Sequence, residues 1–255
     1  MNSHQLLCGI ELETEGNYMV GVSSDYWDFH EDGTLRGPHA EFVLKEPTLM
    51  GDLDPAFREL STFIHSFPVN VTPRCGLHVH IDVRDLSHKE IYSACLAYTL
   101  LEKLLYKISG DRSNNKFCVP VLSSAYVRDA ISRLYIDRDS GTREKLYSGL
   151  NLASIRELGS IEFRMHSGTL DTEEIHDWVY ILHTLVLRAS ALPPEDIIQA
   201  GQTYRSFYSF VVDTLRLTAR PSRLAAELDK LRDCWKTYET KITEQIHFRA
   251  LQLDK

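Results

Sequence analysis

The sequence lacks the motifs that define several common classes of binding site. Neither GxxxxGK[ST] nor GxGxxG occurs, which excludes a P-loop and a Rossmann site. The five cysteines are odd in number and show no CxxC spacing, so we expect reduced thiols in a cytosolic protein. No Lys or Arg precedes the short apolar run near the N-terminus, so no secretory signal is expected. The most apolar run, residues 179–187, is too short to span a bilayer.

The bulk composition predicts a globular chain without a strongly basic surface. The 255 residues are 43% hydrophobic, which suffices for one substantial core. The formal charge of -8 and the pI near 5.8 argue against general binding of nucleic acid. We therefore expect a cytoplasmic protein without general nucleic-acid binding, although one local contact stays open, and without a membrane partner.

One stretch, RCGLHVHID over residues 74–82, combines an apolar face with a chemically active one. Three aliphatic residues alternate with His78, His80 and Asp82, as in a half-buried strand. Strand neighbours two apart lie roughly 6.6 Å from each other, so both histidines can face one pocket. A core strand with two hydrogen-bonded histidines is an equally good interpretation of this stretch alone.

The stretch over residues 6–15 alternates in the same way and places Glu11 and Glu13 on one face. Two such glutamates repel each other unless solvent or a cation neutralises them. A solvated strand edge is the common explanation for such a pair. Ile10 and Leu12 flank Glu11, however, which makes burial beside a cation more credible.

Two further carboxylates flank a predicted turn. Residues 26–30 and the EFVL run that begins at Glu41 have strand character, and Asp32-Gly33 marks the turn between them. Asp32 and Glu41 therefore lie at the two ends of a short connection. Such a connection can bring both carboxylates beside the first pair.

A later stretch, residues 148–171, predicts a third strand with a charged face. Ile161 and Phe163 alternate with Glu162, Arg164 and His166. Glu162 and Arg164 could form a surface pair that contributes little to stability. With a second arginine at residue 156, they are also suited to holding a cation and a phosphate side by side. A basic stretch (Arg133, Arg138, Arg143, Lys145) is either a solvated surface or a phosphate contact.

Helices are predicted between and after these strands. Asp54-Pro55 begins one helix, Ser87 and Glu90 form a capping box before a second, and Asp171 begins a third. In the last quarter, six large residues recur at spacings of four and three: Leu224, Leu228, Leu231, Trp235, Tyr238 and Ile242. This stripe either packs on its own domain, which we favour, or forms an oligomer seam.

The candidate ligands are mostly carboxylates with a single imidazole. Such a set suits Mg²⁺ or Mn²⁺ better than a structural zinc, which prefers cysteines or several histidines. Two or three divalent cations beside an arginine describe a site for a polyphosphate.

The motifs GIELE, EDGTLR followed by Glu41, RCGLHVHID, and GSIEFR followed by GTLD resemble those of the putative amidoligase family. That family is similar in fold to glutamine synthetase and glutamate–cysteine ligase. The resemblance implies an α+β fold in which a curved, mostly antiparallel sheet is backed by helices, here followed by a helical C-terminal segment. It divides the chain into a catalytic domain over residues 1–192 and a helical extension over residues 193–255.

The resemblance also implies a site and a reaction. Glu13, Asp32 and Glu41 would hold one metal, and Glu11, His78 and Glu162 a second. Arg164, with Arg156 as a weaker match, would contact phosphate or the substrate carboxylate, and His80 would lie near the nucleotide or support a ligand. The implied cofactors are ATP and two or three Mg²⁺ or Mn²⁺ ions. The implied reaction joins a carboxylate to an amine through an acyl phosphate.

Two other function classes stay open on sequence grounds. A zinc-dependent hydrolase could use the HVH strand, although it would need further His or Asp ligands and not the Glu11–Glu13 pair. A non-catalytic, metal-stabilised binding module is the second alternative. The sequence leaves open which carboxylate and amine would react and whether the chain forms a homo-oligomer.

Overall fold

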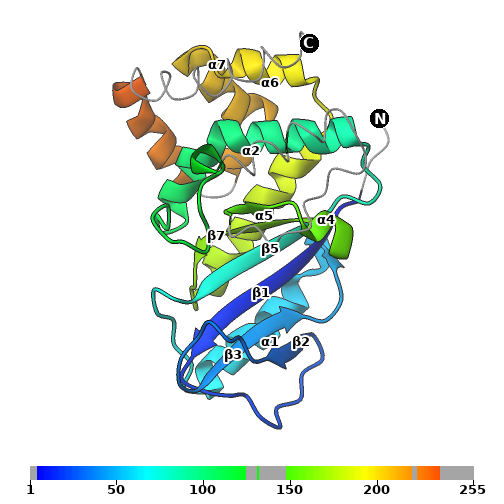
Figure 1. The fold of residues 1–255 in the computed structure, drawn as a ribbon, viewed down its shortest axis with the longest axis vertical. Helices are drawn as coiled ribbons and strands as arrows, with labels where there is room; N and C mark the ends of the chain where they lie inside the picture. Colours follow the sequence, from blue (N-terminus) through cyan, green and yellow to red (C-terminus); the bar gives the residue numbers. More distant parts are fainter. Residues whose placement is uncertain (1–4, 125–130, 132–147, 220–222, 236–255) are drawn as a thin grey trace.

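A single curved, antiparallel sheet organises this computed structural model, which describes residues 5–124, 131, 148–219 and 223–235 (Figure 1). Its seven described strands are β1 (Leu7–Glu15), β2 (Trp27–His30), β3 (His39–Leu44), β4 (Thr48–Leu49), β5 (Gly76–Asp82), β6 (Leu150–Asn151) and β7 (Ser160–Ser167). Six of them follow the order β2-β3-β1-β5-β7-β6, and β4 pairs with the start of β1. The four longest strands therefore lie side by side in the middle of the sheet.

The longest helices, α1 (Asp54–Ser66), α2 (His88–Ile108) and α5 (Thr172–Ala189), pack on one face of this sheet. The short helix α4 (Ser154–Glu157) lies at the other face. The remaining described helices are α6 (Pro194–Ala200), α7 (Tyr204–Ser209) and a helix over residues 223–235. Short 3-10 turns occur at Met50–Asp52, Val121–Ser123 and Leu217–Ala219, and a π-helical turn at Phe210–Thr214. In Figure 1, α1 and α5 lie behind the strands, and α5 contacts β5, α1 and α2. The opposite face of the sheet is left for polar side chains.

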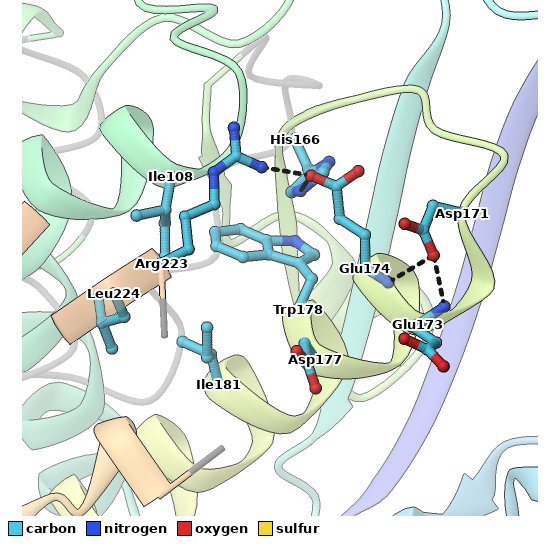
Figure 2. Close-up of a pocket in the computed structure, with 10 residues that line it drawn as sticks. All are labelled: Ile108, His166, Asp171, Glu173, Glu174, Asp177, Trp178, Ile181, Arg223 and Leu224. Carbon is cyan, nitrogen blue, oxygen red and sulfur yellow. Dashed lines mark hydrogen bonds and ion pairs between the residues drawn. The ribbon is translucent and has the colours of Figure 1, made fainter. Parts of the chain in front are cut away.

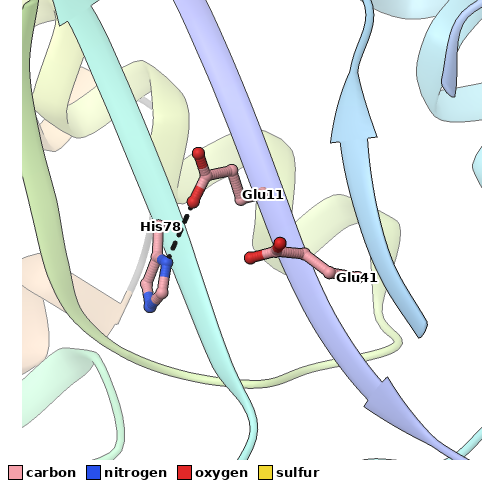
Figure 3. A group of neighbouring side chains, drawn as sticks. All are labelled: Glu11, Glu41 and His78. Atoms are coloured by element: carbon pink, nitrogen blue, oxygen red, sulfur yellow. Dashed lines mark hydrogen bonds and ion pairs between the residues drawn. The ribbon is translucent and has the colours of Figure 1, made fainter. Parts of the chain in front are cut away.

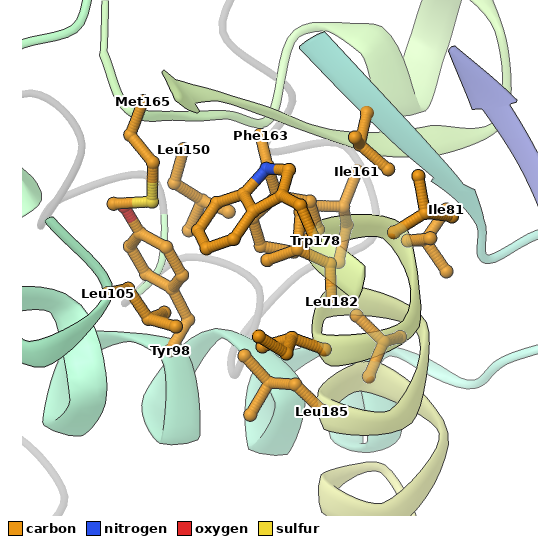
Figure 4. Packing of buried hydrophobic residues seen from close by; sticks show 14 of the residues in the cluster. Ile81, Tyr98, Leu105, Leu150, Ile161, Phe163, Met165, Trp178, Leu182 and Leu185 are labelled. Carbon is orange, nitrogen blue, oxygen red and sulfur yellow. The ribbon is translucent and has the colours of Figure 1, made fainter. Parts of the chain in front are cut away.

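The core fills the space between the sheet and α2 and α5. Ile81 of β5 and Phe163 of β7 point to the helices, where Tyr98 and Trp178 meet them (Figure 4). The Tyr98 and Phe163 rings are 5.6 Å apart between centroids. Burial of such side chains stabilises the fold by about 1.5–3 kcal/mol each. This packing fixes which face of each strand turns away from the helices.

The helix starts expected from the sequence are confirmed. The Ser87 hydroxyl accepts a hydrogen bond from the Glu90 backbone N–H, while the Glu90 carboxylate accepts one from the Ser87 N–H. The Asp171 carboxylate accepts hydrogen bonds from the Glu173 and Glu174 backbone N–H groups at the start of α5. The predicted α+β architecture, with a curved antiparallel sheet backed by helices, is also confirmed. Its specific likeness to glutamine synthetase stays a prediction.

One expected strand face is wrong. The structure does not keep His166 on the same face as Glu162 and Arg164, because the register between β5 and β7 shifts by one residue. Val79 pairs with Phe163 but Leu77 pairs with His166, which leaves two residues of β7 opposite His78. Such a bulge breaks the alternation of side chains. His166 is buried against Trp178 of α5, with ring centroids 4.9 Å apart.

The described part of the C-terminal stripe belongs to the main core. Leu224, Leu228, Leu231 and Trp235 are buried and join the same hydrophobic cluster as the sheet. Tyr238, Ile242 and the basic residues Arg133, Arg138, Arg143 and Lys145 lie outside the described residues. The division at residue 192 stays a prediction. Within the described ranges, no helix combines the length and apolar character needed to cross a bilayer.

Candidate metal centre

Strand register brings the predicted site residues into one row across the polar face of the sheet. Glu41 of β3 lies directly opposite Glu13 of β1, and Glu11 lies directly opposite His78 of β5. His80 in turn lies opposite Glu162 of β7. Like charges directly opposite on a sheet are destabilising, so the Glu13–Glu41 pair calls for a neutralising partner.

Glu13, Asp32 and Glu41 form a first group of possible ligands. Each offers one oxygen, and these three oxygens lie within 4.8 Å of one another. Asp32 reaches the group from the turn between β2 and β3, where its carboxylate accepts a hydrogen bond from the Thr34 backbone N–H at 2.6 Å. The structure thus brings together the three residues expected for one metal. Their role as ligands stays a prediction.

Glu11 joins two further groups. One consists of Glu11, Glu41 and His78, which Figure 3 shows converging from three adjacent strands. The other consists of Glu11, His80 and Glu162. The sequence-based set of Glu11, His78 and Glu162 is also close: His78 Nδ1 lies 3.2 Å from Glu11 and 3.9 Å from Glu162. Either histidine can therefore accompany Glu11.

Electrostatics show that the cluster holds more negative charge than its neighbours neutralise. Burial, reinforced by three nearby carboxylates, raises the pKa of Glu41 from 4.5 to about 8. Burial also raises the pKa of Glu13. Burial would raise the pKa of Glu11 too, but contacts with His78 and His80 lower it below its usual range. A divalent cation would favour the ionised form of all three carboxyl groups.

An orphaned nitrogen supports the fit of a cation. His80 Nδ1 lies 3.0 Å from the Ser160 hydroxyl, whereas the buried Nε2 has no hydrogen-bond partner and lies 3.2 Å from a Glu11 oxygen. A buried polar atom without a hydrogen bond is costly, and a cation or a nucleotide group bound at this point would satisfy it. Oxygen donors with at most one imidazole per group suit Mg²⁺ or Mn²⁺. The described residues do not bring both histidines into a single three-ligand group.

Arg164 lies at the edge of this cluster. Its guanidinium forms an ion pair with Glu162, and the Asn151 side-chain amide donates to the other Glu162 oxygen at 2.6 Å. Glu162 therefore orients Arg164, and Asn151 in turn fixes Glu162. Arg156 is exposed on α4. It is not among the described residues that line the cavity over this cluster, although Ser154 and Glu157 of the same helix are.

A cavity of about 350 Å³ covers the row of ligands. It is lined by Glu11, Asp32, Thr34, Glu41, His78, His80, Asn151, Ser154, Glu157, Leu158, Glu162 and Arg164. This volume is at the lower end of the range for small-molecule sites. A second hollow of about 330 Å³ shares Glu11, His80 and Leu158 with it and continues toward Asp82 and Arg84.

Several residues that hold the candidate ligands in place are not recognisable from the sequence. Asn151 and Ser160 touch Glu162 and His80, and both look like ordinary polar residues in the sequence. Arg112 comes from the loop after α2, where it donates a hydrogen bond to the His166 carbonyl at 2.9 Å. No local pattern distinguishes these three. Arg74 belongs to the motif RCGLHVHID, but its two hydrogen bonds to the Glu15 carboxylate are seen only in the structure.

Gly76 lets the cluster close up at one end. Its backbone N–H donates to a Glu13 oxygen at 2.5 Å. A Cβ atom here would lie 2.7 Å from Arg112 Nη1 and 2.9 Å from His78 Nε2. The absence of a side chain therefore allows a carboxylate, an imidazole and a guanidinium to approach one point.

Comparison with known protein families finds a match. Residues 69–186 match a family model described as "Putative amidoligase enzyme". The matched segment contains β5 and β7 with His78, His80, Glu162 and Arg164, and the sheet adds the carboxylates of β1 and β3 to them. No curated protein matches the chain. The family match indicates an enzyme of ligase type and supports the resemblance seen in the motifs: residues 69–186 of this chain are similar to a putative amidoligase family.

Proposed function

We propose that this protein is an ATP-dependent ligase that joins a carboxylate to an amine through an acyl phosphate. The observation that carries the proposal is the row of overlapping ligand groups on β3, β1, β5 and β7, with Arg164 beside it. Bound Mg²⁺ or Mn²⁺ would neutralise the ATP phosphates and spread the charge that develops during transfer. The family match supports ligase chemistry in general.

The reaction needs two successive displacements. A carboxylate oxygen of the first substrate attacks the γ-phosphorus of ATP, and ADP leaves. The amine nitrogen of the second substrate then attacks the acyl carbon, phosphate leaves with that carboxylate oxygen, and the nitrogen loses a proton. No nucleophile of the enzyme is required.

The chain's own residues supply position and charge for these steps. Glu11, Glu13, Asp32 and Glu41, together with His78 and Glu162, would hold the cations in a fixed row. Arg164 would approach the transferring phosphoryl group or the substrate carboxylate, since a guanidinium matches either group with two parallel hydrogen bonds. His80 and Arg156 would bind near the nucleotide. Pre-set charges of this kind stabilise a transition state without reorganisation.

Incubation with ATP, Mg²⁺ and pooled carboxylates and amines tests the proposal. Mass analysis should show a condensation product, with ADP and phosphate formed in equal amounts and only in the presence of the divalent cation. AMP and pyrophosphate would instead indicate an adenylate and contradict the acyl phosphate. Hydrolysis of an amide without ATP would favour the zinc hydrolase, and cation binding without turnover would favour the binding module.

A further inference from the structure

A separate cavity lies away from the candidate metal centre and from the two hollows described above. It has a volume of about 350 Å³ and opens where the end of α2, the start of α5 and the helix over residues 223–235 meet (Figure 2). None of the described residues that line it lines the cavity over the metal ligands. Its apolar wall consists of Ile108, Trp178, Ile181 and Leu224.

The cavity contains an unmet hydrogen-bond donor. Trp178 is only 2% exposed, and its buried Nε1–H has no hydrogen-bond partner. Figure 2 shows this nitrogen on the side of the ring that faces His166 and the Glu174 carboxylate. A buried donor left unpaired costs about 1–3 kcal/mol. A ligand oxygen in the cavity would remove that cost.

Two acceptors face each other across the same space. His166 Nδ1 lies 2.6 Å from the Ser167 carbonyl, so this nitrogen carries the proton and Nε2 is left as an acceptor. His166 Nε2 lies 4.0 Å from a Glu174 oxygen. Two acceptors cannot bond to each other, but one ammonium group can donate to both. Asp171, Glu173 and Asp177 add negative charge around this point.

A cation lies beside the acceptors. The Arg223 guanidinium is 2.5 Å from Glu174, and its side chain is 58% exposed. One guanidinium has five N–H donors, so this ion pair leaves others to face the cavity. The cavity thus offers donors from Trp178 and Arg223 and acceptors from His166 and Glu174.

We propose that this cavity binds a small zwitterion of the α-amino-acid class with an aliphatic side chain. Its carboxylate accepts from the Trp178 indole and the Arg223 guanidinium. Its ammonium group donates to Glu174 and to His166 Nε2, and its side chain packs on Ile108, Ile181 and Leu224. This site is separate from the proposed ligase site and does not depend on ATP.

Calorimetric titration with three probes of similar shape tests the proposal. L-leucine carries both charges, 4-methylpentanoate lacks the amino group and 3-methylbutylamine lacks the carboxylate. L-leucine should bind saturably, and each singly charged probe should bind at least about tenfold more weakly, as expected for loss of one charged hydrogen-bonding group. No saturable binding of L-leucine, or equal binding of the amine alone, would overturn the proposal.

Substitutions locate the binding. Trp178→Phe keeps the ring and removes the donor, and Arg223→Gln is a milder change on an exposed side chain that guards against misfolding of the first variant. Both should weaken L-leucine binding about tenfold. Arg232→Gln, on the same helix and 69% exposed, is the matched control and should bind like the wild type. Glu11→Gln should also leave binding unchanged. Loss of binding in Glu11→Gln but not in Trp178→Phe or Arg223→Gln would place L-leucine at the metal centre and overturn the proposal.

Discussion

His78 and His80 share one strand face but meet different partners. His78 has ring nitrogens within 4 Å of Glu11, Glu13 and Glu162. Among the described residues, His80 has a ring nitrogen within 4 Å of one carboxylate, that of Glu11, and its other nitrogen contacts the Ser160 hydroxyl. The centre of the charged row is therefore His78.

We predict that His78→Ala reduces turnover by more than about 100-fold, together with Glu11→Ala and Glu162→Ala, because each loses a ligand. His80→Ala should retain measurable activity, with a loss of about 10–100-fold that is typical of supporting residues. Turnover of the four variants, each checked for folding by circular dichroism, is the measurement. An inactive His80→Ala beside an active His78→Ala would place the second cation with Glu11, His80 and Glu162 instead.

Glu41 should make the metal-free protein less stable as pH rises. Its pKa is raised from 4.5 to about 8, so between these values the folded chain keeps a proton that the unfolded chain has lost. Stability from this group is present below pH 4.5 and is lost as pH rises toward 8, by at most about 1.4 kcal/mol per pH unit. Thermal melts between pH 5 and 8 should show this fall, and Mg²⁺ should stabilise most at pH 8.

Glu41→Gln provides the control for that experiment. The amide has no proton to lose, so its metal-free melting temperature should fall less steeply with pH than that of the wild type. It should also respond less to Mg²⁺. Parallel pH profiles for the two chains would show that Glu41 is not perturbed by its neighbours.

At the scale of elements, β5 begins at a glycine, Gly76, which has no side chain. Gly76 receives the Glu13 carboxylate on its N–H, and a Cβ atom would crowd the ends of three flexible side chains. A Cβ atom would displace only the ends of these side chains, so the fold would be kept. The displaced atoms belong to the site, however, so its geometry would change.

Gly76→Ala should therefore lower turnover and metal affinity by at least about tenfold, in the range seen when the supports of metal ligands are changed. Its melting temperature should stay close to that of the wild type. Gly51→Ala is the matched control, since a Cβ there meets nothing within 4 Å and the residue is not next to a proposed ligand. Equal activity of the two variants would mean that the close approach at Gly76 is not needed for function.

Local patterns predicted the strands but not how they meet. Alternation was enough to place Glu11 and Glu13 on one face of β1, and Ser87 with Glu90 to begin α2. Which residues lie opposite each other depends on pairing between strands distant in sequence, so the partner of His80 could not be read from RCGLHVHID. The bulge in β7 that moves His166 to the helix side follows from the same long-range pairing.

At the scale of the whole molecule, the helix over residues 223–235 closes the core. Leu224 and Leu228 are fully buried, and each contributes about 1.5–3 kcal/mol by burial. Deletion of all residues after Ser222 should therefore expose core and cause aggregation, visible by light scattering and a lowered melting temperature. A folded, monomeric truncated chain would instead indicate that the stripe serves as an oligomer seam.

The central claim concerns the whole sheet: carboxylates from three strands and one turn lie in a row with the histidines of β5 and bind divalent cations for ATP. Titration with Mn²⁺, with free ion followed by electron paramagnetic resonance, counts those cations directly. In the presence of ATP the wild type should bind two or three Mn²⁺ ions per chain, and Mg²⁺ should displace them. Glu13→Gln should lose at least one ion, whereas Glu195→Gln, in the first turn of α6, should match the wild type. Failure of the wild type to bind Mn²⁺ beyond the amount held by ATP alone, or an unchanged count in Glu13→Gln, would contradict the account.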